Sequence, residues 1–210
     1  MLALLLVGAL AATPVPTAPH SAARTSDTTP SVSRAAFHDA MRQLWEDHIT
    51  WTRLYIVSAA AGLPDAEQTA GRLLKNQADI GNAIAPFYGA AAGQRLTALL
   101  RGHILTAAKL LGAAKGGDTI TVNAASVEWS ANADSIATFL SSANPRHWPV
   151  ETLKTAMRMH LKLTLDEATA RLQANWAADI AAYDEVHRHI LQMADVLSDG
   201  IIRQFPGRFN

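Results

Sequence analysis

The sequence predicts an all-α protein, an up-and-down antiparallel bundle of five or six helices. The chain is rich in alanine and 49% hydrophobic, a composition that favours helices and a packed core. Apolar residues recur three and four positions apart over long segments, which is typical of amphipathic helices. No segment alternates strand with helix, and short breaks rich in glycine and proline separate the helical segments. Short connections place consecutive helices side by side in opposite directions.

The apolar part of an export signal is recognisable before the bundle begins. Residues 1–12 form an apolar run that is too short to span a membrane but fits the apolar part of a signal peptide, with Ala9-Leu10-Ala11 as the cleavage site. No lysine or arginine precedes the run, so either the natural start lies upstream, which we favour, or the run is not a signal. Residues 13–33 are rich in Pro, Thr, Ser and Ala and predict a disordered spacer. Residues 34–210 then form one helical domain.

Three helices are expected in the first half of this domain. The first runs from residue 34 to 61 and ends at Gly62-Leu63-Pro64. Asp65, with Gln68 three residues later, forms a capping box for the second helix, which stops at Pro86 and Gly89. The third runs from about residue 90 to 114, where two glycines end it.

The second half of the domain is expected to contribute three more. Asp118 caps a helix that extends to about residue 141, and Pro149 opens the next helix. Thr164 and Glu167 form a second capping box, which would open a long last helix that ends near Gln204.

Two of these segments share a weak repeat. His103-Ile-Leu and His189-Ile-Leu are each followed by a matching alanine and leucine. An old internal duplication would explain the match, and so would coincidence in an alanine-rich chain.

Histidines and carboxylates on apolar helix faces are the candidates for a functional site. His48, His103, His160 and His189 each fall on the apolar stripe of a different helix. Imidazoles that converge with a carboxylate in a bundle core can bind a transition metal. Histidine with methionine and no cysteine favours copper as the bound metal. Zinc or another transition metal is an alternative, and haem is less favoured than either. The candidate metal ligands are His48, His103, His160, Asp179, His187, His189 and Met193.

The same residues also fit two other interpretations. Buried carboxylates need partners, and Arg53 lies in an apolar run where it could pair with one. We therefore expect a structural charge network that includes Arg53, Asp79 and Asp134. Acid/base catalysis by His–Asp pairs is a further alternative, although no serine elbow or metal-hydrolase motif is present.

Composition limits the classes of binding partner that we expect for this chain. The chain has 18 basic and 18 acidic residues, so its net charge is zero and no basic tract predicts nucleic-acid binding. It has no cysteine, which removes disulfides and thiolate chemistry. No segment predicts a transmembrane helix in the mature chain. A protein partner or a homodimer is compatible with this composition, and Trp45 and Trp148 are the candidate contact residues.

Three motifs carry a resemblance to known sequences. They are LWEDHITWTRLYIV at Leu44–Val57, NQADIGN at Asn76–Asn82 and FLSSANP at Phe139–Pro145. Through them the chain, from about Ala35 to Phe209, resembles a group of uncharacterised exported bacterial all-helical proteins. The resemblance implies export and a helical fold. It brings no activity, cofactor or catalytic residue with it.

These observations favour binding over catalysis. The leading hypothesis is an exported, soluble helical bundle that holds a transition metal or small ligand at a core site lined by histidine and aspartate. The alternatives are a structural or interaction protein of the cell envelope and, third, an enzyme that uses His/Asp acid–base chemistry.

Overall fold

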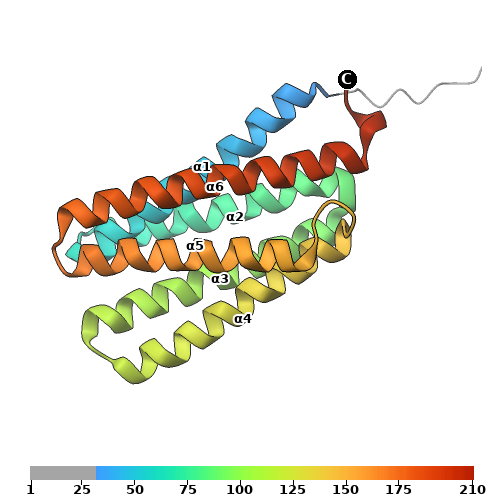
Figure 1. The fold of residues 1–210 in the computed structure, drawn as a ribbon. Coiled ribbons are helices and arrows are strands. Elements are labelled where there is room, and N and C mark those ends of the chain that lie inside the picture. The colour runs from blue at the N-terminus through green and yellow to red at the C-terminus, as the bar shows by residue number, and fades with distance from the viewer. Residues whose placement is uncertain (1–31) are drawn as a thin grey trace, which may run out of the picture.

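The computed structural model describes residues 32–210, which form a bundle of six long helices (Figure 1). The predicted export signal and all but the end of the predicted spacer lie outside these residues. The helices are α1 (Arg34–Ala61), α2 (Ala66–Tyr88), α3 (Ala90–Gly116), α4 (Thr119–Ala143), α5 (Val150–Leu172) and α6 (Trp176–Gln204), followed by one 3₁₀ turn, η1 (Pro206–Arg208). The prediction of an all-α up-and-down bundle is confirmed.

The helices form a closed ring. Each helix packs against the next one along the chain, and α6 returns to pack against α1. The two ends of the described part of the chain meet where Val32 and Phe209 form an isolated parallel β-bridge. Phe209 also packs on Phe37 and Phe87, with ring centroids 5.1 and 5.5 Å apart. α1 also contacts α3 and α5 across the ring, so its inward face lies near the centre of the bundle.

Capping residues fix where several helices begin and end. The side chains of Ser33, Asp118 and Asn175 each accept a hydrogen bond from the backbone N–H three residues further on. Gly62 and Gly117 end α1 and α3 in the left-handed conformation, with φ of 67° and 72°, which glycine adopts without steric cost. Ser33 was expected in the spacer, but it serves as the cap of α1.

The predicted start of the last helix at Thr164 is wrong. α5 continues through this point to Leu172, and α6 begins at Trp176. The Thr164 hydroxyl donates to the backbone carbonyl of His160 within the same helix, and Glu167 points into the core. A Thr-x-x-Glu pattern therefore occurs here without a helix start, because both side chains have other partners.

The second helix also differs in detail from the prediction. Asp65 does precede α2, but its side chain makes no capping hydrogen bond, so the predicted box with Gln68 is not formed. Pro86 lies inside the last turn of α2 and does not stop it. No helix among residues 32–210 has a stretch both long enough and apolar enough to cross a membrane. The internal duplication stays a prediction.

Candidate functional site

Four histidine side chains, one from each of four helices, gather in the middle of the bundle. They are His48 of α1, His103 of α3, His160 of α5 and His189 of α6. The ring centroid of His160 lies 5.8 Å from that of His48, 6.1 Å from that of His103 and 6.4 Å from that of His189. The first three are buried and His189 is half-buried. We call these four residues the histidine cluster.

Hydrogen bonds set the proton positions on two of the rings. The Asn132 carbonyl oxygen lies 2.9 Å from His103 Nδ1, so this nitrogen donates and the lone pair of a neutral His103 lies on Nε2. The amide nitrogen of Gln77 lies 3.3 Å from His48 Nδ1, which therefore accepts. These polar neighbours orient the rings within an otherwise apolar core.

Burial keeps three histidines of the cluster, His48, His103 and His160, neutral by lowering their pKa values. It lowers the pKa of His48 to about 3, with a smaller effect from His103. It lowers the pKa of His103 to about 4, against the opposing effect of the Asn132 hydrogen bond. The pKa of His160 also lies well below its usual value, first because of burial and then because of the neighbouring histidines. Neutral imidazole is the form that binds metals, and it is the form that an apolar core tolerates.

Several polar atoms around the cluster have no partner. Seven buried side-chain nitrogen and oxygen atoms among residues 32–210 lack a hydrogen bond, and five of them belong to the cluster or to side chains that touch it. These five are Trp45 Nε1, Gln77 Oε1, His103 Nε2, Trp129 Nε1 and His160 Nδ1. Buried polar atoms usually have partners, so this concentration is unusual.

A small cavity lies among the same side chains. Its volume is about 20 Å³, and its lining includes His48, His103 and His160 together with the thioethers Met157 and Met193. A cavity of this size holds one water molecule or one ion. Of the predicted metal ligands, these three histidines and Met193 therefore lie around one small space.

The other predicted ligands lie elsewhere. Asp179 pairs with arginines, and His187 lies at the surface with its Nε2 atom 3.2 Å from Glu46 Oε1. His189 donates through Nε2 to the carbonyl of Ala156, 3.0 Å away. In the described part of the chain, no group of three or more His, Asp or Glu side chains is already placed to hold a metal ion. A metal would therefore require rings of the cluster to turn.

Asp179 belongs to a second polar group, which we call the arginine network. It comprises Arg53 of α1, Glu167 and Arg171 of α5, and Asp179 of α6. Asp179 accepts from both arginines, with Arg53 Nη2 2.9 Å and Arg171 Nη1 3.2 Å from its Oδ2 atom. Arg53 Nη1 also donates to Glu167 Oε1 at 3.0 Å. The two carboxylates are 1% and 0% exposed, respectively. Arg53 thus has the buried carboxylate partner that the sequence led us to expect.

The two carboxylates of this network titrate differently. Burial raises the pKa of Glu167 to about 7, although the hydrogen bond from Arg53 opposes it. Burial acts in the same direction on Asp179, but hydrogen bonds from Arg53 and Arg171 outweigh it and hold the pKa of Asp179 below its usual value. Asp179 is therefore ionised near neutral pH, whereas Glu167 keeps its proton to a higher pH than an ordinary glutamate.

Asp79 and Asp134 do not join Arg53. Asp79 Oδ2 lies 2.8 Å from Lys75 Nζ, one turn earlier on α2, and Asp134 Oδ2 lies 3.2 Å from Arg158 Nη2. Both pairs lie at the surface, where a carboxylate is solvated and needs no buried partner. The predicted network with these two aspartates is therefore wrong.

The two tryptophans expected to contact a partner are buried in the bundle. Trp45 is 6% exposed and Trp148 is 1% exposed, and the indole N–H of Trp148 donates to the carbonyl of Val196. Trp148 precedes α5 but folds onto α6 next to Gly200, where a side chain would collide with it. Trp176 is instead the exposed tryptophan, at 54%.

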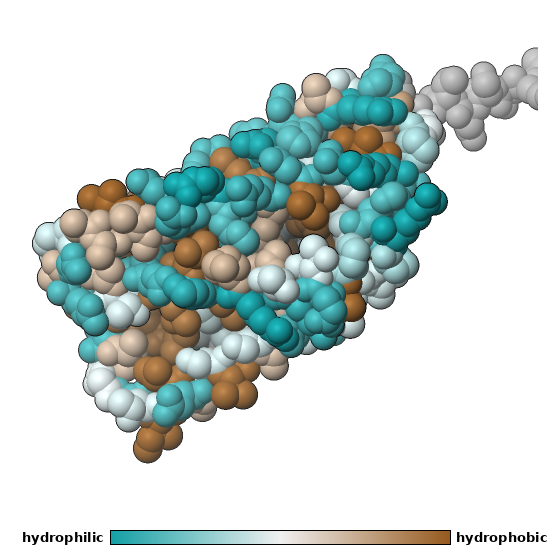
Figure 2. Space-filling model, in the orientation of Figure 1, coloured by the Kyte–Doolittle hydropathy of each residue, from teal (hydrophilic) through white to brown (hydrophobic). Residues whose placement is uncertain are grey.

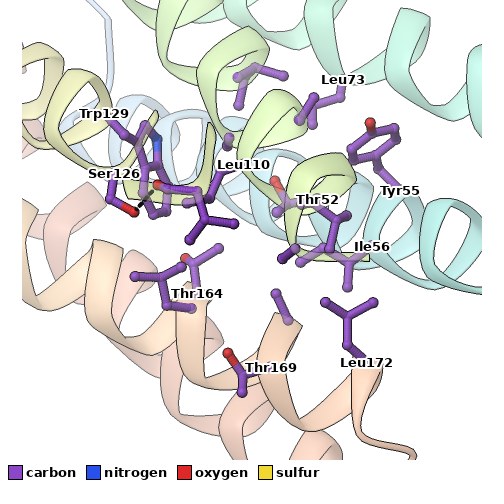
Figure 3. Close-up of a pocket in the computed structure, with 18 residues that line it drawn as sticks. Thr52, Tyr55, Ile56, Leu73, Leu110, Ser126, Trp129, Thr164, Thr169 and Leu172 are labelled. Carbon is purple, nitrogen blue, oxygen red and sulfur yellow. Dashed lines mark hydrogen bonds between the residues drawn. The ribbon is translucent and has the colours of Figure 1, made fainter. Parts of the chain in front are cut away.

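An apolar pocket lies between α1, α3, α4 and α5, with a volume of about 300 Å³ (Figure 3). Side chains from these helices, among them Ile56, Leu110, Trp129 and Leu172, surround a common space. Apolar residues also reach the surface near this pocket, where the α3–α4 hairpin faces α5 (Figure 2). We call this space the apolar pocket.

The apolar pocket begins one helical turn from the histidine cluster. Thr52, Ala107 and Thr164 line it, and each comes four residues after a histidine of the cluster. The ring of Trp129, which also lines the pocket, packs on His103 with centroids 5.1 Å apart. The cluster therefore lies directly behind the residues that line the pocket, without lining it itself.

The pocket wall is uncharged. No Asp, Glu, Lys, Arg or His side chain lines it. The hydroxyls of Thr52, Thr164 and Ser126 donate to carbonyls of their own helices at 2.8–2.9 Å, so their hydrogen-bond donors are already used. Burial raises the pKa of Tyr55, which stays neutral. An apolar group is what such a wall accommodates.

This pocket was not predicted from the sequence. Small residues at inward positions of α3 and α5, such as Ala107, Ala108 and Ala168, leave the space unfilled. Alanine at successive inward positions was the available signal, but in an alanine-rich chain it also fits close helix packing. No protein-family model, no curated protein and no solved structure matches this chain.

Proposed function

We propose that the chain is an exported small-molecule-binding protein and that the apolar pocket is its ligand site. The observation that carries the proposal is an uncharged, mainly apolar space of about 300 Å³ between α1, α3, α4 and α5. An apolar cavity of about 150 Å³ is already enough to bind benzene, so a space twice as large accommodates a larger apolar ligand. Filling it restores the dispersion contacts that its lining lacks.

The uncharged dye N-phenyl-1-naphthylamine tests this proposal. We expect its fluorescence to rise on binding and an apolar competitor to displace it. Ala108 faces the pocket, so Ala108→Phe should fill part of the space and weaken dye binding at least tenfold. Ala124→Phe is the matched control, because Ala124 is exposed on α4 and lines no part of the pocket.

The two variants make the outcome specific. Circular dichroism must show both to be folded before their affinities are compared. Loss of binding in Ala108→Phe alone supports the pocket as the site. Equal binding in both variants, or no fluorescence change with the unmodified protein, would overturn the proposal.

A second candidate function is metal binding at the histidine cluster. The small cavity among His48, His103 and His160 supports it, because two unpartnered nitrogens, His103 Nε2 and His160 Nδ1, belong to its lining. Met157 and Met193 add soft sulfur ligands that suit copper, while three imidazoles also suit zinc.

Elemental analysis of protein purified without a histidine tag tests this second function. Near-stoichiometric metal that is lost in the double variant His103→Ala/His160→Ala would support it. Added Zn²⁺ or Cu²⁺ should also raise the melting temperature of the unmodified protein and not that of the variant. Metal-free protein whose melting temperature is unchanged by either ion would leave the cavity as a site for one bridging water.

A further inference from the structure

A cationic recess adjoins the apolar pocket. It has a volume of about 330 Å³, and Lys115, Arg171 and Trp176 are in its lining. Ala114 and Leu172 line both the recess and the pocket, so the two spaces meet at these residues. No acidic side chain lines the recess. The recess lies where α3 and α5 end and α6 begins.

The two cations of the recess retain capacity for an anion. Lys115 Nζ donates to the backbone carbonyl of Ala59 at 2.8 Å, which is its one hydrogen bond among residues 32–210. A lysine ammonium has three donors, so further ones are free. Arg171 donates through Nη1 to Asp179, and its guanidinium stacks on Trp176 with its Cζ atom 4.8 Å from the ring centroid. Its other nitrogens make no hydrogen bond within the described residues.

We infer that the ligand is a single-chain amphiphile, with its alkyl chain in the apolar pocket and a carboxylate head in the recess near Lys115 and Arg171. This inference rests on the proposed function and specifies its ligand class. An uncharged wall that opens beside two cations matches the two parts of such a molecule.

The size of the pocket limits the chain length. Benzene, with six carbons, occupies a cavity of about 150 Å³. In the same proportion, the pocket of about 300 Å³ holds about twelve carbons. Dodecanoate is therefore the appropriate anionic ligand, and dodecan-1-ol is its uncharged counterpart with the same chain.

Displacement of N-phenyl-1-naphthylamine from the full chain by these two compounds tests the inference. We expect dodecanoate to displace the dye at a concentration at least five times lower than dodecan-1-ol does. Lys115→Gln should remove most of this difference. The concentration of dodecanoate that displaces the dye should rise about fivefold, and that of the alcohol should not change. Lys109→Gln is the matched control, since Lys109 is an exposed lysine of α3 that pairs with Glu128 and lines neither space.

The outcomes separate this inference from the proposed function. If the dye binds but acid and alcohol displace it equally, the inference is wrong and the apolar site stands. Lys115 and Arg171 would then only stabilise the C-terminal ends of α3 and α5, as cations do there. If Lys115→Gln and Lys109→Gln weaken dodecanoate to the same degree, the head does not lie in the recess. Failure of the dye to bind at all would overturn both proposals.

Discussion

The two carboxylates of the arginine network show how a residue's partners decide its charge. Glu167 and Asp179 are both buried, yet their pKa values shift in opposite directions. Asp179 accepts hydrogen bonds from two arginines, whereas Glu167 accepts from one and leaves its Oε2 atom without a partner. Two cations outweigh the cost of burying one carboxylate, and one shared cation does not.

This difference predicts unequal effects of neutral substitutions. Asp179→Asn removes the anion that Arg53 and Arg171 share, so we expect it to lower the free energy of unfolding at pH 7.5 by about 3 kcal/mol. Glu167→Gln replaces a side chain that is already partly protonated, so we expect a change of less than about 1 kcal/mol. Urea unfolding of both variants measures the difference. Equal losses would contradict the assignment of charge within the network.

Individual side chains were predictable where their helix position was informative. Placing His48, His103, His160 and His189 on apolar stripes required only the helical period. Only part of the arginine network could be predicted from the sequence. Arg53 stands out in an apolar run, but Glu167 resembled a capping residue. Which histidines face one another depends on the order of helices around the ring, and the period of a single helix holds no such information.

At the scale of helices, α2 and α3 approach each other through glycine. A Cβ atom at Gly81 would lie 2.5 Å from the carbonyl oxygen of Gly93, and one at Gly93 would lie 2.6 Å from that of Gly81. No side chain fits between the two backbones at this crossing. The short connection at Gly89 keeps the two helices together at the same end of the hairpin.

A pair of substitutions on α2 tests this close approach. Gly81→Ala should force the helices apart and lower the free energy of unfolding by about 2 kcal/mol or more. Gly71→Ala adds the same methyl group where nothing lies within 4 Å, so it should raise stability by up to about 1 kcal/mol through helix propensity. Chemical denaturation distinguishes the two signs. If Gly81→Ala is neutral, the crossing is looser than described.

The turn between α5 and α6 contains a backbone strain of its own. Ala174 adopts a φ of 55°, in the left-handed region where a Cβ atom is unfavourable. Ala174→Gly should therefore stabilise the protein by about 0.5–1 kcal/mol. Ala181→Gly, at an exposed position inside α6, should instead destabilise it by about 1 kcal/mol. Melting temperatures of the two variants should thus move in opposite directions.

At the scale of the whole molecule, composition and periodicity were enough to predict the class, the antiparallel order and nearly all helix boundaries. The apolar pocket depends on how the α3–α4 hairpin faces α5, which is a property of the assembled ring (Figure 1). Local pattern cannot show whether alanines on facing helices meet or leave a gap. The proposed binding site therefore depends on packing, although the histidines behind it could be placed on helix faces from the sequence.

The stability of the whole molecule should depend on pH through two opposing groups. His48, His103 and His160 have lowered pKa values in the folded protein, so the unfolded chain binds more protons below about pH 6.5. Their contribution is complete above that pH and is lost as the pH falls towards 4. Glu167 has a raised pKa of about 7, so the folded protein binds its proton first, and acidification between pH 7 and 4.5 is stabilising at this residue.

The histidines should outweigh the single glutamate. At pH 5, which is 1.5 units below the usual histidine pKa, keeping each buried histidine neutral lowers the free energy of unfolding by roughly 2 kcal/mol. Protonation of Glu167 raises the free energy of unfolding by about as much as one of the three histidines lowers it. We therefore expect the free energy of unfolding to fall by about 2–4 kcal/mol between pH 7.5 and pH 5, as measured by urea titration at each pH. Glu167→Gln should steepen this fall because it removes the opposing group, whereas His160→Leu should make it shallower. Stability that is unchanged over this range would mean that water reaches the histidine cluster and that its imidazoles titrate as they do in solution.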